Sequence, residues 1–455
     1  MTRRMHPARG AAARGAGVGP RAGPHAPAAV AVARAPATAD RWDPLLLFVA
    51  LMLLTSLWRI QEIWPPLATL QAPSLAFTGA GACWLLGRDP RRSLRRLKHP
   101  VTWIAVALTV HLVASVPGSV YGEGSYHFLK EDHAKTLLLA ALLAASIRSF
   151  VDLRRLAGIQ VFGAAIYSAF ALRDSAAMVD GRMTDLLYYD ANDFGMLVVA
   201  TAPLAIFFFT HGRTARVRFG ALVAFALFTI GMVKSGSRAA FLAFGALTSF
   251  MLLRYRAVPA GRRIAAIVGA VILVALAGQH EFWVRMRTML HPAQDYNWVG
   301  NEPDGRMEIW KRGIGYMLDR PLFGVGVGVF DVADGLLAPQ ARRQQYGMGW
   351  RWAAAHNSFV QIGAETGVVG LLLFVAMLGS ALRTTVRIAF PAGGPDSRTV
   401  QAAMGQALTG VLMVYCVNGF FLSQAYGVLL YSTLALVVGL ARVCPPAPAP
   451  GPRRR

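Results

Sequence analysis

Long apolar stretches separated by short polar gaps repeat along the chain from Pro44 onward. An α-helix needs about 20 apolar residues to cross a lipid bilayer, and several of these stretches approach that length. The pattern therefore predicts about twelve transmembrane helices, at residues 44–60, 67–87, 100–117, 134–150, 156–172, 191–210, 219–234, 239–254, 264–279, 358–379, 401–421 and 426–442.

The two ends of the chain lack this pattern. Residues 1–41 are rich in Ala, Pro, Gly and Arg, and they contain no apolar run. Such a segment cannot bury enough surface to offset its chain entropy, and it has no apolar centre of the kind that a signal peptide needs. We expect a disordered cytoplasmic tail over residues 1–41, or a start codon placed too early, and a second cytoplasmic tail over residues 444–455.

The composition supports a membrane protein. Of the 455 residues, 55% are hydrophobic and only 15% are charged, and the mean hydropathy is +0.44. Soluble domains contain about 45–50% apolar and about 25% charged residues. Three widely separated cysteines form no disulfide framework or zinc motif. The predicted fold class is an all-α polytopic helical bundle with one large loop that contains short helices.

The net charge of +23 is explained by the predicted orientation of the chain in the membrane. With a cytoplasmic N-terminus, each predicted cytoplasmic loop contains more Lys and Arg than Asp and Glu. Basic residues are enriched in the cytoplasmic loops of membrane proteins. The charge therefore requires no nucleic-acid partner.

One gap between the apolar stretches is much longer than the others. Residues 281–355 separate nine predicted spans in 42–280 from three in 356–443. Long loops in compact proteins are usually functional, although this one could simply connect two spans.

A helix is predicted inside this loop over residues 306–318, with Asp304 as its N-cap. Trp310, Ile314 and Met317 have helical spacing and predict the apolar face of that helix.

Arg238 breaks the charge rule, because it lies in a predicted outward turn, Lys234-Ser235-Gly236-Ser237-Arg238. An Arg in a turn of small residues beside a helix N-terminus is suited to binding phosphate. Lys234 and Ser237 are candidate supporting residues. The alternative is an Arg that extends to the lipid headgroups.

A second candidate site lies at the start of the tenth span, where His356-Asn357 precede a helix with Gly363, Gly367 and Gly370 on one face. Small residues allow a neighbouring helix to pack closely. His356 could act as a general base, although a lone interfacial His is more often only polar decoration. Glu365 lies deeper in the same span, and an intramembrane carboxylate requires a partner.

Two further motifs have structural interpretations. Tyr189 and Asp193 flank the start of the sixth span; a capping role is favoured there, with contact to a ligand as the alternative. Gly324-Val325-Gly326-Val327-Gly328 lacks nucleotide-binding spacing and predicts a turn that packs against other backbone.

Three motifs in order resemble the superfamily of O-antigen ligases, O-antigen polymerases and pilin-type O-oligosaccharyltransferases. His356-Asn357, nine residues, Gly367, two residues and Gly370 are similar to the H-[NSQ]-x9-G-x-x-[GTY] signature of O-antigen ligases. Two further pieces resemble the same superfamily: residues 235–242, and residues 306–310 followed by 319–326. The resemblance covers roughly residues 185–425.

This resemblance implies a GT-C type glycosyltransferase of the bacterial inner membrane that acts at the periplasmic face without a cofactor or metal. Arg238 and Arg306 would bind the diphosphate of an undecaprenyl-linked glycan donor. His356 would activate the acceptor hydroxyl for transfer with inversion. Asn357 is a candidate supporting residue. The first outward gap contains only Glu62 and no DxD-type acidic pair, which argues against a metal-dependent enzyme.

The acceptor stays open. Transfer to lipid A-core, as by a ligase, is the first choice; a growing glycan, as for a polymerase, and a protein are the alternatives. A secondary transporter and a non-catalytic envelope scaffold are competing classes. A transporter should show related halves and broken midplane helices, and the sequence shows no internal repeat.

Overall fold

The computed structural model describes residues 41–174, 178–179, 182–184, 186, 188–256, 258–299, 305–339, 352–391 and 399–444. Nearly all of both predicted tails, and the predicted N-cap Asp304, lie outside these residues. All of the candidate site residues lie inside them.

Within the described ranges, a helix coincides with each apolar stretch in the sequence. These helices are α1 (Pro44–Ser56), α4 (Ala72–Leu86), α5 (Pro100–Ser115), α7 (Ala134–Ser146), α8 (Phe150–Asp174), α9 (Ala191–His211), α10 (Ala215–Ser235), α11 (Arg238–Leu253), α12 (Ala260–Ala277), α17 (Ser358–Ala389), α18 (Val400–Gly419) and α19 (Val428–Val443). Among the described residues, seven helical segments are long and apolar enough to cross a membrane by length and composition. The architecture is therefore that of an all-α polytopic membrane protein, and the count of twelve crossings stays a prediction.

Shorter elements connect these helices. They are α2 (Ile60–Ile63), α3 (Pro65–Thr69), α6 (Gly122–His127), α13 (His280–Arg287), α14 (Tyr296–Val299), α15 (Arg306–Asp319) and α16 (Phe330–Leu337), the 3-10 turns Pro90–Arg92, Leu94–Leu97, Val116–Gly118, Thr288–Leu290 and Pro292–Gln294, and a π-helical turn, Phe128–His133. Strands β1 (Met178–Val179) and β2 (Arg182–Met183) pair antiparallel, with Met178 opposite Met183 and Val179 opposite Arg182.

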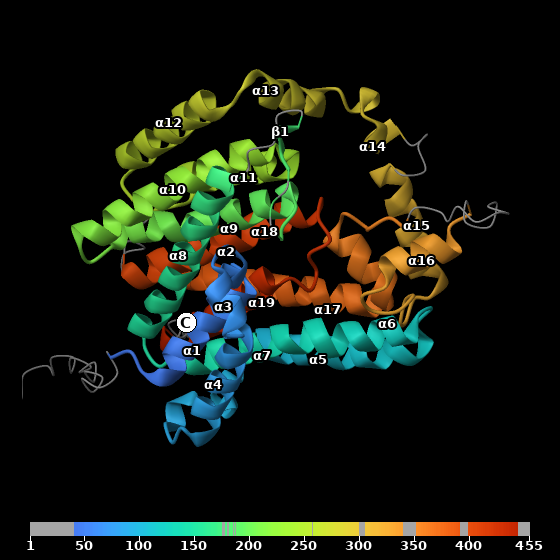
Figure 1. The fold of residues 1–455 in the computed structure, drawn as a ribbon, viewed down its shortest axis with the longest axis horizontal. Helices are drawn as coiled ribbons and strands as arrows, with labels where there is room; N and C mark the ends of the chain where they lie inside the picture. Colours follow the sequence, from blue (N-terminus) through green and yellow to red (C-terminus); the bar gives the residue numbers. More distant parts are fainter. Residues whose placement is uncertain are drawn as a thin grey trace, which may run out of the picture. The chain divides into compact units, whose positions relative to one another are not determined.

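Helix α9 is the most buried of the candidate spans. It packs against α8, α10, α11 and α18, while α17 packs against α5, α15 and α18. Figure 1 shows α10, α11 and α12 on one side of α9 and α18, and α5 and α7 on the opposite side. A continuous apolar core joins these helices.

A network of charges fixes the start of α1 against the connection between α7 and α8. Asp43 contacts Arg92 at 2.5 Å and Arg148 at 2.7 Å, and Arg148 also contacts the buried Asp152 at 3.0 Å. Each of these arginines has a nearby carboxylate, so the cluster is a structural connection.

The described part of the long loop, residues 280–299, 305–339 and 352–356, is called the loop segment below. Helices α15 and α16 lie near α6, at one end of α17 and α5 (Figure 1). They form a small core of their own with α17, built from Ile309, Tyr316, Val325, Phe330 and Ala333 together with Ala355 and Ala364.

Helix α15 begins at Arg306 and ends at Asp319, so the predicted helix is confirmed; of its predicted apolar positions, Trp310 and Met317 are partly buried and Ile314 is exposed. Ile314 is 44% exposed, and the buried positions are Ile309, Gly313 and Tyr316. A Cβ atom at Gly313 would lie 2.5 Å from the Val360 side chain. The closest approach between helices is therefore made at a glycine, which a search for large apolar residues does not find.

Helix α17 is interrupted at Gly367, whose φ of 73° lies in the left-handed region. A Cβ atom there would lie 2.3 Å from the Pro321 carbonyl oxygen, which accepts a hydrogen bond from the Val368 amide at 2.8 Å. The glycine face was predicted to contact a helix; Gly363 does contact α15 through Met317, whereas Gly367 contacts loop backbone.

The glycine-rich turn at residues 324–328 packs into this interruption, as predicted. The amides of Val325 and Gly326 donate to the carbonyl groups of Ala364 and Glu365, at 2.9 and 3.0 Å. Gly324, Gly326 and Gly328 all have positive φ, which favours glycine at these positions.

Candidate functional site

The turn between α10 and α11 places Arg238 at the first position of α11. Gly236 ends α10 with a φ of 59°, and the Ser237 hydroxyl caps α11 by accepting from the Ala240 amide at 3.3 Å. The turn is buried against Gly195 of α9, where a Cβ atom would lie 2.8 Å from Ser235 Oγ. Small residues are therefore required for this packing, and Ser237 has a capping role.

The Arg238 side chain extends from this turn toward the loop segment. Its guanidinium donates to Thr288 Oγ1 at 3.0 Å and forms an ion pair with Asp295. Burial raises the pKa of Asp295, but hydrogen bonds from Asn297 and Arg238 outweigh this effect and lower the pKa overall. Asp295 is therefore a carboxylate at neutral pH, held at a position that an anionic ligand could take.

Arg238 lines a cavity of about 320 Å³ together with three other arginines. This cavity, the arginine pocket, includes Arg182, Arg238, Arg285 and Arg306. The described residues that line it also include Asn192, Asn297 and Trp298, but no Asp or Glu. A concave site rich in guanidinium groups is suited to an anion with several oxygen atoms, such as a diphosphate.

Arg306 reaches the pocket from the first turn of α15. One turn later, Trp310 Nε1 donates to the Ala355 carbonyl oxygen at 3.0 Å, which fixes α15 beside His356. The ring of Trp310 also meets that of Trp298, a pocket residue. The predicted pair Arg238 and Arg306 is thus brought to one cavity from two separate helices.

His356 lies immediately before α17 and has an unusual backbone. Its φ is 47°, a left-handed conformation that is uncommon outside glycine. Its amide donates to Ser423 Oγ at 2.8 Å, which helps to hold this conformation. Burial lowers the pKa of the imidazole, and the positive charge of Arg306 lowers it further. His356 is therefore neutral at pH 7, the form that a general base requires.

The connection between α18 and α19 supports His356. Asn357 caps α17 by accepting from the amides of Phe359 and Val360, at 2.9 and 3.1 Å. Ser358 Oγ donates to the Leu422 carbonyl oxygen at 2.7 Å. Asn357 therefore fixes the backbone at the start of α17, directly after His356.

The other candidates occupy different positions around the site. Asp190 caps α9, as favoured for this segment, and Asp193 accepts from Gln424 Nε2 at 2.9 Å. The Tyr189 hydroxyl donates to the Leu57 carbonyl oxygen at 2.6 Å. Lys234 lies in the last turn of α10 and is not among the residues that line the arginine pocket.

Glu365 has the partners that an intramembrane carboxylate requires. It is buried, and it accepts from the Tyr426 hydroxyl at 2.7 Å and from the amides of Gly328 and Phe330 at 3.0 and 3.2 Å. These contacts join α17 to the loop segment and to the start of α19. Its role is therefore to position the loop segment.

Sequence reasoning missed Arg182, Arg285 and Asn192 as pocket residues. The charge rule that singled out Arg238 also covers Arg182 and Arg285, because both lie in gaps predicted to face outward. Asp295 and Ser423 gave no such signal, because their contacts arise only when distant segments meet.

Residues 222–375 match the family model described as O-Antigen ligase. This range contains Arg238, Arg306, His356 and Glu365. A search of curated proteins finds no match to the chain. The match agrees with the motifs at 235–242, 306–326 and 356–370, and with the all-α membrane architecture that carries them. The O-Antigen ligase match over residues 222–375 thus supports the resemblance to the O-antigen ligase/polymerase superfamily.

Proposed function

We propose that this protein transfers a glycan from an undecaprenyl-diphosphate donor to an acceptor hydroxyl at the periplasmic face of the bacterial inner membrane. Lipid A-core is the proposed acceptor, as for an O-antigen ligase. The observation that carries the proposal is the arginine pocket, which both Arg238 and Arg306 line, together with the electrostatic effect of Arg306 on His356.

The chemistry assigns one task to each group. His356 takes the proton of the acceptor hydroxyl, and the acceptor oxygen attacks the anomeric carbon while the bond from that carbon to the diphosphate breaks. Negative charge grows on the leaving diphosphate, where the guanidinium groups of Arg238 and Arg306 stabilise it. Prearranged charges of this kind often make the largest contribution to catalysis.

The structure offers a reason for the placement of the base. Burial lowers the pKa of His356 and Arg306 lowers it further; because Arg306 also lines the arginine pocket, the same side chain favours the neutral base and faces the proposed leaving group. The left-handed backbone of His356 would hold the imidazole in one orientation, and such strained conformations are concentrated at functional sites.

The test is glycan transfer in membranes that contain the His356→Ala protein at normal abundance. We expect loss of transfer and accumulation of the lipid-linked donor. His280→Ala is the matched control, because His280 is an exposed histidine at the start of α13 in the same loop segment. An unchanged glycan profile and donor pool in His356→Ala would contradict the mechanism.

The same experiment separates the acceptors. Loss of glycan-capped core at unchanged chain length identifies a ligase, whereas loss of long chains with single repeats still attached identifies a polymerase. Loss of glycan only from protein identifies an O-oligosaccharyltransferase.

A further inference from the structure

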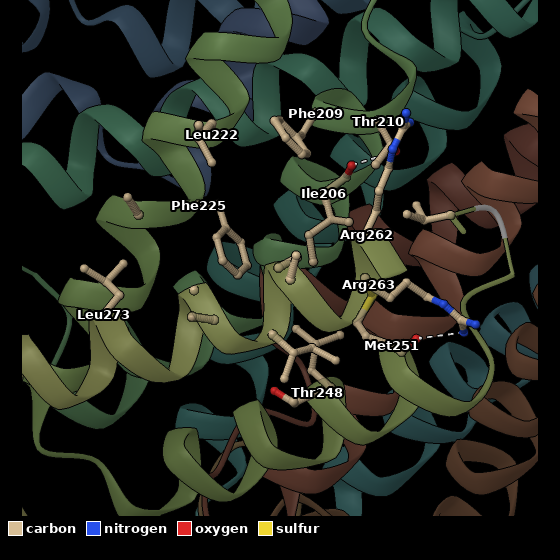
Figure 2. Close-up of a pocket in the computed structure, with 18 of the residues that line it drawn as sticks. Ile206, Phe209, Thr210, Leu222, Phe225, Thr248, Met251, Arg262, Arg263 and Leu273 are labelled. Atoms are coloured by element: carbon tan, nitrogen blue, oxygen red, sulfur yellow. Dashed lines mark hydrogen bonds between the residues drawn. The ribbon is translucent and has the colours of Figure 1, made fainter. Parts of the chain in front are cut away.

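A second and larger cavity lies between α9, α10, α11 and α12, and the proposed transfer reaction does not use it. Its volume is about 720 Å³, within the range of about 300–1,000 Å³ that is typical of small-molecule sites. Figure 2 shows side chains from these helices around it. We call it the α12 pocket.

One part of the α12 pocket is apolar. Leu222 and Phe225 of α10 and Leu273 of α12 lie together on one side of the view in Figure 2. Helix α12 is only 11% buried over its apolar window, and it packs mainly against α10 and α11. The apolar part therefore lies beside a candidate membrane span that the rest of the protein covers little, and an acyl chain would fit its chemistry.

The other part of the α12 pocket is cationic. Arg262 and Arg263 lie opposite Leu273 in Figure 2, and Arg218 also lines the pocket. Arg218 Nε donates to the Gly212 carbonyl oxygen at 2.9 Å, and Arg263 Nη1 donates to the Leu252 carbonyl oxygen at 2.9 Å. These bonds hold the guanidinium groups near the ends of α9 and α11.

These arginines have no carboxylate nearby in the sequence. From Phe194 to His280 the chain contains no Asp or Glu. In the described part of the chain, Arg263 Nε is buried without a hydrogen-bond partner. Arg262 and Arg263 also lie in the first turn of α12, where the helix dipole is positive and favours an anion. A group of cations in this setting is stabilised by an external anion.

The α12 pocket is separate from the arginine pocket. Arg218 is near the start of α10, whereas Arg238 follows its end. From Arg218 to the end of α10 at Ser235 the chain advances 17 residues, about 25 Å of helix at a rise of 1.5 Å per residue. One ligand phosphate cannot contact both groups of arginines.

From these observations we propose that the α12 pocket binds one anionic phospholipid, with its phosphate on Arg218, Arg262 and Arg263 and an acyl chain along α10 and α12. The cavity has a charged end and an apolar end, and a phospholipid has the same two parts. Basic pockets between membrane helices are suited to anionic headgroups.

The test measures lipid retained by the purified full-length protein. The protein is exchanged into detergent with equal amounts of phosphatidylglycerol and phosphatidylcholine, and bound lipid is counted by native mass spectrometry. We expect one retained phosphatidylglycerol. The triple variant Arg218→Gln, Arg262→Gln, Arg263→Gln should lower its retention about tenfold or more.

A matched variant controls for overall charge. Arg213→Gln, Arg216→Gln, Arg256→Gln removes three arginines from the same connections, and none of these lines the α12 pocket. Equal losses in both triple variants would overturn the proposal, because the lipid would then respond only to surface charge. Equal retention of phosphatidylcholine, or selective retention of an added polyprenyl phosphate, would also overturn it.

A second variant tests the apolar part without changing charge. Gly269 lines the pocket, and a Cβ atom there would meet no other atom within 4 Å, so Gly269→Leu fills the cavity without a clash at Cβ. Gly245→Leu is the control, because Gly245 is equally open but lies outside the pocket lining. We expect Gly269→Leu, but not Gly245→Leu, to release the lipid. Retention of the lipid by both variants would overturn the proposed path of the acyl chain.

Discussion

Two arginine–aspartate pairs hold the loop segment, and they differ in construction. Arg312 donates to Asp334 from Nε at 2.6 Å and from Nη2 at 3.0 Å, and the Tyr316 hydroxyl donates to the same carboxylate at 3.3 Å. Arg238 pairs with Asp295 through Nη1 alone, and the same nitrogen also donates to Thr288.

The two pairs also differ in exposure. The side chains of Arg312 and Asp334 are 8% and 0% exposed, whereas those of Arg238 and Asp295 are 25% and 8% exposed. A buried pair with two parallel hydrogen bonds cannot separate without leaving a charge in an apolar core. A partly exposed pair at the edge of a cavity can exchange one anion for another. The first pair is therefore a structural connection, and we infer that the second belongs to the binding site.

The largest expected effect follows from removing half of the buried pair. Asp334→Ala should lower the opening free energy of α15 and α16 by about 3–5 kcal/mol, because Arg312 would remain buried without its counter-charge. Hydrogen exchange of the α15 and α16 amides measures this energy. Asp331→Ala, at an exposed position of the same helix, should have little effect; equal effects would contradict the assignment.

The next effect concerns the exchangeable pair. Arg238→Gln should leave the fold intact and lower glycan transfer about 100-fold or more, the cost of losing one prearranged group that stabilises developing charge. The measurement is transfer at matched protein abundance. Arg287→Gln removes an exposed arginine outside the arginine pocket and should retain activity. Full activity in Arg238→Gln would show that Arg238 does not belong to the proposed binding site.

A smaller effect is expected from pH. Burial and Arg306 hold the pKa of His356 below its ordinary value of 6.5, so the neutral base persists at and above that pH. Activity should fall only as pH drops below the lowered pKa, by about tenfold per unit. Arg306→Gln should move this fall toward higher pH, because it removes a positive charge. An acid limb that does not move would contradict the proximity of Arg306 and His356.

The smallest effect is expected when the charge of Asp295, the carboxylate paired with Arg238, is removed. Asp295→Asn should lower the KM for the lipid-linked donor about threefold, since the diphosphate would no longer displace a carboxylate from a partly exposed Arg238. Comparison of KM with kcat measures the change. Asp319→Asn is an exposed control in the same loop segment. A large fall in kcat would instead make Asp295 part of the reaction.

Much of this fold follows from the sequence because membranes impose a simple rule. A long apolar stretch must satisfy its backbone groups internally, so the stretches at 191–210 and 219–234 appear as α9 and α10 within a few residues. The order of the motifs around Arg238, Arg306 and His356 is also visible in the sequence, and it agrees with the family model that matches residues 222–375.

The remaining features depend on contacts between distant segments. The interruption of α17 at Gly367 packs against the carbonyl group of Pro321, which lies 46 residues earlier in the chain, and a hydropathy pattern does not show that contact. The ion pair between Arg238 and Asp295 has the same origin. Apolar spacing marked Ile314, which is exposed, whereas Gly313 beside it makes the close approach to α17, so the buried side of α15 could not be predicted from apolar spacing alone.

The hydrogen bonds of the glycine-rich turn have a consequence for biosynthesis. The turn at residues 324–328 is synthesised before its acceptors on α17 and about 100 residues before Tyr426, the last partner of Glu365. At about 5–20 residues per second, a ribosome needs about 5–20 s for this interval. During that time the contacts between the loop segment and the later helices are incomplete. The final shape of the loop segment therefore depends on helices that have not yet left the ribosome.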